Sequence, residues 1–275
     1  MTELALRPVR LASPLVAELF GRQRTLAGYG LLLLLLCGLA LVLEALDPRT
    51  LASGVGVWVK PAKFFASVGI FALTLAWFAG YVRPERRGAW PVRAAVALVL
   101  VAGTLELAWI GWQGANGLES HFNFDTAFYR TMFNLMGLFA VLLVGSTLPL
   151  AWEIARRPAA GLAGDFVAAV VIGLVLAFLL GGSLGGAIAA NGGHGVGREA
   201  GGLPVFGWNR AGGDLRIAHF VGIHAMQAIP IAAALAAGLA ARLRWLAVLS
   251  ASLLYVMLAF ALYAQAAAGR PLLPL

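Results

Sequence analysis

Charged residues are scarce in this chain. Only 12% of its 275 residues are Asp, Glu, Lys or Arg, whereas 61% are hydrophobic. A soluble domain has about 25% charged and roughly 45–50% apolar residues, so this composition excludes an ordinary soluble protein and indicates a lipid bilayer. The net charge of +8 does not indicate nucleic-acid binding, because the loops on one side of a membrane also accumulate Lys and Arg.

Cysteine and histidine are scarce as well. The single cysteine, Cys37, lies within an apolar run, which excludes an intrachain disulfide and any Cys-rich metal motif. The chain contains 4 histidines. It shows no internal repeat, and the sequence therefore does not suggest an inverted-repeat transporter.

Seven long apolar stretches dominate the chain. Each is long enough to cross about 30 Å of hydrocarbon as a helix of about 20 residues. The sequence therefore predicts an all-α fold, a polytopic membrane protein built as a bundle of seven transmembrane helices. Residues 1–25 are expected to form an interfacial segment, and 267–275 a short C-terminal tail. Within the domain 26–266, the predicted spans are 26–46, 62–82, 91–113, 128–152, 165–190, 215–241 and 244–266.

Basic residues predict the orientation of the bundle. Seven spans place the two termini on opposite sides, and the short turns at Arg86, Arg156 and Arg242 would then share the side of the N-terminus. Cytoplasmic loops are enriched in Lys and Arg. We therefore expect the N-terminus inside and the C-terminus outside, in the cell membrane, and a bacterial inner membrane as the compartment.

Polar residues at membrane depth gather in the outer halves of the predicted spans. The sixth span alone carries Arg216, His219, His224 and Gln227, and Glu106 lies about two turns inside the third. Such groups are costly in hydrocarbon and usually mark functional sites. The inner halves are almost purely apolar, which argues against a polar pathway across the membrane. The pattern favours a one-sided, outward-facing site.

Metal or haem ligation is the first hypothesis for this site. Neutral imidazole is a common ligand, and a helix bundle can bring side chains from several helices together. A redox or other enzymatic activity would follow. The predicted metal ligands are His121, His219 and His224, the predicted catalytic groups are Glu106, Lys63 and Arg130, and the predicted cofactor contacts are Gln113, Asn134, Arg216 and Gln227.

Helical spacing limits the metal hypothesis. His219 and His224 are five positions apart, which separates them by about 140° around an ideal helix. Histidines four apart could hold one ion together, but this pair would face different neighbours. A local π-bulge at Gly222 would bring the two imidazoles closer.

The same polar residues fit two other hypotheses. The basic side chains could contact a carboxylate, phosphate or quinone-like head group, as in a binding or transport protein for a small anionic solute or lipid head group. The polar face could instead dock a partner, as in an accessory membrane subunit. In every case we expect contact with the lipid bilayer, a small-molecule or lipid-like substrate, and no nucleic acid.

Glycine marks two further segments. Residues 191–214 form a Gly-rich outer loop that could fold over the site as a lid. In the fifth span, Gly181 and Gly185 are four apart, as are Gly182 and Gly186. This spacing favours close helix packing, either within the bundle or between copies in a homo-oligomer.

Overall fold

The computed structural model describes residues 14–274 and is built almost entirely from helices. Seven helical segments are long and apolar enough to cross a membrane, which confirms the predicted helical membrane bundle. Residues 1–13 of the predicted interfacial segment lie outside the described residues. The helices are α1 (Pro14–Arg22), α2 (Arg24–Leu46), α3 (Val59–Ala79), α4 (Trp90–Ala115), α5 (Ala127–Gly145), α6 (Thr147–Arg156), α7 (Gly164–Ala190), α8 (Leu215–Leu235) and α9 (Ala241–Ala267), with a short 3₁₀ turn at Pro84–Arg86.

Two boundaries differ from the predicted ones. The fourth span runs over Ala127–Arg156 as α5 and α6, which meet at Ser146, where the side-chain hydroxyl donates to the Leu143 carbonyl at 2.6 Å. The sixth span ends at Leu235 rather than near residue 241, because the next backbone N–H groups, from Ala237 and Leu239, reach back only three residues and form tight turns.

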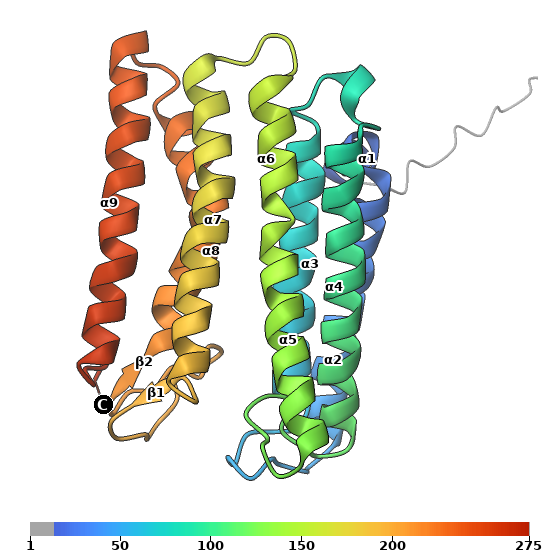
Figure 1. The fold of residues 1–275 in the computed structure, drawn as a ribbon, viewed down its shortest axis with the longest axis vertical. Helices are drawn as coiled ribbons and strands as arrows, with labels where there is room; N and C mark the ends of the chain where they lie inside the picture. Colours follow the sequence, from blue (N-terminus) through green and yellow to red (C-terminus); the bar gives the residue numbers. More distant parts are fainter. Residues whose placement is uncertain (1–13, 275) are drawn as a thin grey trace, which may run out of the picture.

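The helices form two groups that lie side by side in Figure 1, with α7, α8 and α9 on one side and α1 to α6 on the other. Helices α7 and α8 are in close contact along their length because glycines let the backbones approach. A Cβ atom at Gly173 would lie 2.9 Å from the Ala225 carbonyl oxygen, and one at Gly222 would lie 2.9 Å from Leu180 Cβ.

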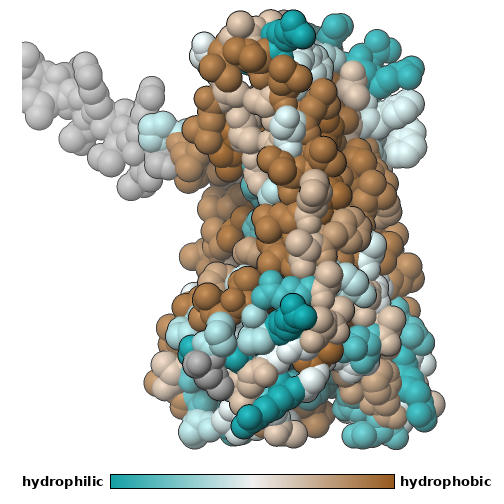
Figure 2. Space-filling view, turned by 90° about the vertical axis from the view of Figure 1, so that its left-hand side faces the viewer, coloured by the Kyte–Doolittle hydropathy of each residue, from teal (hydrophilic) through white to brown (hydrophobic). Residues whose placement is uncertain are grey.

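The two ends of the bundle differ in character. We call the lower end in Figure 1, which holds the loops 47–58, 116–126 and 191–214 and the C-terminus, the polar end. The opposite end, which holds the turns 80–89, 157–163 and 236–240 and the start of α2, is called the arginine-rich end. Figure 2 shows an apolar band between two more polar ends, as expected for a protein that spans a bilayer.

Ion pairs secure the arginine-rich end. Arg86 pairs with the buried carboxylate of Glu153 at 2.7 Å, and Arg244 pairs with that of Asp165 at 3.0 Å. The guanidinium of Arg22 lies 3.9 Å from the ring centroid of Trp77. Several arginines that predict orientation therefore also hold neighbouring helices together.

Candidate functional site

The chain's only two lysines begin α3 one turn apart. Pro61 stands between them, and the first helical turn tolerates its missing N–H. Lys63 is exposed, and its ammonium donates to the Phe206 carbonyl in the Gly-rich loop at 3.0 Å. Lys60 is partly buried, and within residues 14–274 its ammonium forms neither a hydrogen bond nor a salt bridge. One lysine thus contacts the loop, and the other is free to contact a ligand.

Glu106 and Gln113 lie two turns apart on the face of α4 that packs against other helices. They are 4% and 2% exposed. The Gln113 amide donates to the Glu119 carbonyl at 3.3 Å. One carboxylate oxygen of Glu106, Oε2, is buried and has no hydrogen-bond partner among the described residues. Such a group in a native structure calls for an explanation.

The loop 116–126 brings His121 to the polar end. Its Nδ1 lies 3.1 Å from Ser120 Oγ, and its ring centroid lies 6.1 Å from that of Phe64 on α3. The Trp109 indole fixes the loop by donating to the Ser120 carbonyl at 2.9 Å. Burial lowers the pKa of His121 to about 3, and the positive charge of Lys60 contributes to this shift. His121 is therefore a neutral imidazole at physiological pH.

The Gly-rich loop is folded. Strands β1 (Gly195–Val196) and β2 (Gly213–Asp214) pair antiparallel at its base. The carboxylate of Asp214, which has no exposure, accepts from the Asn209 backbone N–H at 2.9 Å and from Arg216 through its backbone and guanidinium. This arrangement ties the loop to the first turn of α8.

Burial and nearby charges shift the pKa values of Asp214 and His194. Burial is the largest influence on the pKa of Asp214 and would raise it, but the hydrogen bond and charge of Arg216, the Asn209 backbone N–H and the nearby His194 together hold the pKa below its ordinary value. Burial and the charge of Arg216 lower the pKa of His194, whose Nδ1 lies 3.9 Å from Asp214. Arg216, a predicted cofactor contact, therefore directs its guanidinium to Asp214 and to the Gly207 carbonyl, at 2.7 Å.

The charge of Lys60 links these separate segments. It interacts electrostatically with Glu106 on α4, with Glu119 in the loop 116–126 and with Arg216 on α8. It also acts on His121 and on His194 in the Gly-rich loop. Ionisable side chains from α4, α8 and two loops thus lie within electrostatic range of one ammonium group on α3. We call Lys60, Lys63, Glu106, His121 and Arg216 the polar site.

The three predicted metal ligands point to different neighbours. His219 faces α7, where its Nδ1 would lie 3.2 Å from a Cβ atom at Gly185. His224 instead contacts Phe220, at 4.2 Å between ring centroids, and its Nδ1 lies 3.2 Å from Gln227. Helix α8 is regular through both histidines, so the π-bulge considered above does not occur.

No group of three or more His, Cys, Asp or Glu side chains in the described part of the chain could hold a metal ion. The arrangement of donors therefore does not support the predicted three-histidine site. Metal or haem binding by this protein stays a prediction, which an absorption spectrum and elemental analysis of the purified protein can test.

Three other predicted residues lie apart from Lys60. Arg130 and Asn134 are exposed on one face of α5, and their side chains form no hydrogen bond or ion pair within the described range. Gln227 donates to Thr74 Oγ1 at 3.1 Å and so links α8 with α3. The charge of Arg130 is not among those that act on Lys60.

Sequence reasoning overlooks Asp214, which reads only as the start of a polar stretch. An Asp directly before a helix is a common N-cap, and the Asp214 carboxylate does accept from the Arg216 N–H. Lys60 is a candidate from the sequence, as a contact for an anionic head group together with Lys63, and the alternative there is that both lysines reach toward lipid phosphates.

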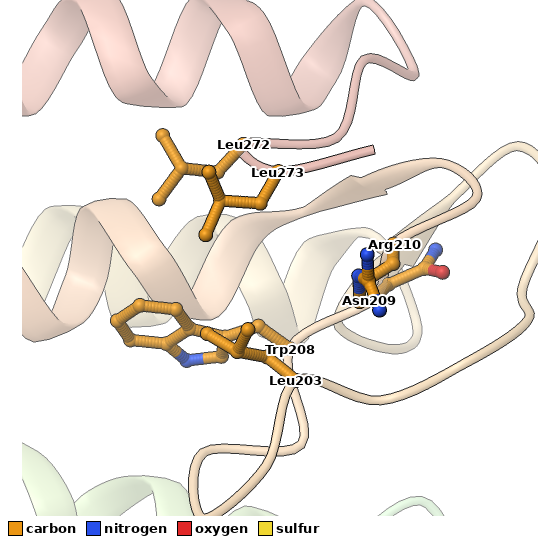
Figure 3. A pocket seen from close by; sticks show the side chains of 6 residues that line it. All are labelled: Leu203, Trp208, Asn209, Arg210, Leu272 and Leu273. Atoms are coloured by element: carbon orange, nitrogen blue, oxygen red, sulfur yellow. The ribbon is translucent and has the colours of Figure 1, made fainter. Parts of the chain in front are cut away.

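Two cavities lie away from the polar site. Figure 3 shows Leu203 and Trp208 of the Gly-rich loop against Leu272 and Leu273 of the C-terminal tail. The space between them is about 10 Å³, at most enough for one water. The loop and the tail are therefore packed against each other here without room for a ligand. A hollow of about 410 Å³ between α4 and α5 is lined only by apolar side chains, including Leu98 and Phe139, and would face lipid chains.

Comparisons with family models, with curated proteins and with solved structures find no match. The functional assignment therefore rests on the geometry of the polar end.

Proposed function

We propose that the polar end binds a small anionic solute or lipid head group at the outer face of a cell membrane. The observation that carries this proposal is the position of Lys60, whose charge reaches polar side chains of four other segments while its own ammonium has no hydrogen-bond partner among the described residues. A lysine in this state can receive an oxyanion as a compact point charge.

Lys63 adds the second contact. Its ammonium is exposed, and its one hydrogen bond within residues 14–274 is to the Phe206 carbonyl, a neutral acceptor, so an anion can join or replace that contact. Aromatic rings stand beside it, because Phe206 stacks on Trp208 at 4.6 Å between centroids and Phe220 meets Trp208 edge-on. Aromatic side chains with one polar neighbour suit the boundary between head groups and acyl chains.

The binding test uses purified full-length protein in an uncharged detergent, titrated calorimetrically with hexyl phosphate. We expect Lys60→Gln to weaken binding by about 10-fold or more, because a charged hydrogen bond contributes roughly 1.5–3 kcal/mol, and Lys63→Gln to weaken it less. Arg270→Gln removes an exposed charge near the C-terminus and is the matched control. Equal affinities for all four proteins would refute the proposal.

The orientation is part of the same proposal, with the polar end outside and the arginine-rich end in the cytoplasm. In a Cys37→Ser background, a cysteine replacing exposed Val205 should react with a membrane-impermeant maleimide on intact cells. A cysteine replacing exposed Gly88 should react only after the membrane is opened. The reverse pattern would invert the assignment.

A further inference from the structure

A line of side-chain hydrogen bonds joins α8 to α3 at membrane depth, beyond the polar site. The Gln227 amide donates to Thr74 Oγ1 at 3.1 Å, and the Thr74 hydroxyl donates to the Ile70 carbonyl of its own helix at 2.8 Å. The other end of the Gln227 side chain, Oε1, lies 3.2 Å from His224 Nδ1. All four residues belong to two of the long apolar spans, where no water replaces a missing partner.

The direction of these hydrogen bonds determines the tautomer of His224. The Thr74 hydroxyl has one proton, which it gives to the Ile70 carbonyl, so toward Gln227 it accepts and the amide N–H donates. The amide oxygen of Gln227 then faces His224, and because an amide oxygen only accepts, Nδ1 carries the ring proton. In a neutral imidazole the other nitrogen is an acceptor. His224 Nε2 therefore presents a lone pair.

This lone pair is unused and within reach of a ligand. Within residues 14–274 the His224 imidazole makes its one hydrogen bond through Nδ1. The ring is partly buried, but Nε2 is not among the fully buried atoms that lack a partner, so a molecule outside the bundle can reach it. An acceptor without a partner at membrane depth is costly. A bound hydrogen-bond donor would remove that cost.

Aromatic rings stand beside the His224 imidazole. Phe220, one turn earlier on α8, lies 4.2 Å from it between ring centroids and is 40% exposed. Phe220 in turn meets Phe206 and Trp208 edge-on, at 5.9 and 5.6 Å. The rings thus continue from His224 to the polar end, where Lys63 donates to the Phe206 carbonyl. Flat apolar side chains beside a single acceptor suit a flat apolar molecule that carries one donor.

We propose that His224 Nε2 accepts a hydrogen bond from the hydroxyl group of a lipid-soluble phenol bound beside Phe220. Gln227 and Thr74 are positioning residues, because they hold the ring proton on Nδ1 and leave Nε2 as the acceptor. This ligand is neutral and meets a lone pair, whereas the anion proposed above meets the positive charge of Lys60. The two proposals are therefore independent.

The binding test titrates the purified full-length protein in an uncharged detergent at about pH 8, where imidazole is neutral. The two probes are para-octylphenol and para-octylanisole, which share a ring and a chain, but the methyl ether has no proton to donate. We expect the phenol to bind about 3- to 10-fold more tightly, from one hydrogen bond. His224→Phe keeps an aromatic ring without an acceptor and should bring this ratio to about 1.

The tautomer is measured separately, by nitrogen NMR of protein labelled isotopically at its histidines, with His224→Phe to identify the signals. We expect the ring proton on Nδ1 in the wild type. Thr74→Val keeps the shape of Thr74 but removes the oxygen that accepts from Gln227, so it should lower both the Nδ1–H fraction and the preference for the phenol. Ser183→Ala is the matched control, because the Ser183 hydroxyl donates to the Leu179 carbonyl of its own helix, and it should change neither.

Equal binding of the two probes by the wild type, or a preference for the phenol that survives in His224→Phe, would overturn the inference. So would a wild-type His224 with its ring proton on Nε2, because that nitrogen would then be a donor. Each of these results would leave the anion binding proposed at Lys60 untouched.

Discussion

Asp214 shows how one residue determines the shape of a segment that contains little regular structure. Its carboxylate has no exposure, and the donors around it come from Asn209 on the loop and from Arg216 on α8. A buried carboxylate is stable only when paired. These partners therefore tie the turn before α8 to the first turn of that helix.

Removing that carboxylate should therefore release the loop. Asp214→Ala leaves the Arg216 guanidinium without its ion-pair partner, and breaking such a pair costs about 3 kcal/mol, somewhat less here because Arg216 is 32% exposed. The loss can be measured by unfolding in a sodium dodecyl sulfate titration, with tryptic cleavage at Arg198 as a local readout. Glu18→Ala, which removes an exposed pair with Arg22, should cost less than about 1 kcal/mol. A similar cost for both variants would contradict this role.

His121 makes stability depend on pH. Its pKa is about 3 in the folded protein against 6.5 for the free side chain. Above pH 6.5 the imidazole is neutral in both states, and below it only the unfolded chain takes up a proton, so stability falls as pH decreases toward 3. We expect the melting temperature to fall more steeply between about pH 8 and about pH 5 in the wild type than in His121→Phe. Parallel curves would show that His121 does not titrate in this way.

At the scale of elements, α7 and α8 form the closest pair of helices. Gly173 and Gly222 face the partner backbone, whereas a Cβ atom added at Gly182 would have no neighbouring atom within 4 Å among the described residues. The predicted close packing of small residues therefore occurs within the bundle, where Gly181 of α7 lies against Ile223 of α8. A homo-oligomer through the remaining glycines stays a prediction.

Alanine substitutions can separate these two faces. Gly173→Ala places a Cβ atom 2.9 Å from the Ala225 carbonyl oxygen, and such overpacking costs about 1–3 kcal/mol. Gly182→Ala should be neutral or stabilise the helix by up to about 1 kcal/mol. Unfolding in a sodium dodecyl sulfate titration measures both. Equal stability of the two variants would show that the close approach of α7 and α8 is not required.

At the scale of the whole molecule, the sequence predicts the seven spans well because apolar length is a direct physical requirement of the bilayer. Most boundaries agree within a few residues, and the division of the fourth span into α5 and α6 at Ser146 is a local feature that hydropathy does not reveal. The arrangement of polar side chains is harder to predict. The separation of His219 and His224 follows from helix geometry, but the contact of Lys63 with Phe206 joins residues far apart in the sequence and depends on how the loop folds.

The central claim is that polar groups from several segments form one binding site around Lys60. Because Lys60 and Lys63 are the only lysines, an amine-reactive reagent followed by mass spectrometry reports on this site alone, apart from the N-terminal amine. We predict that hydrogen phosphate or hexyl phosphate slows labelling of Lys60 strongly and of Lys63 less. Unchanged labelling of both lysines at saturating phosphate and hexyl phosphate would contradict the account.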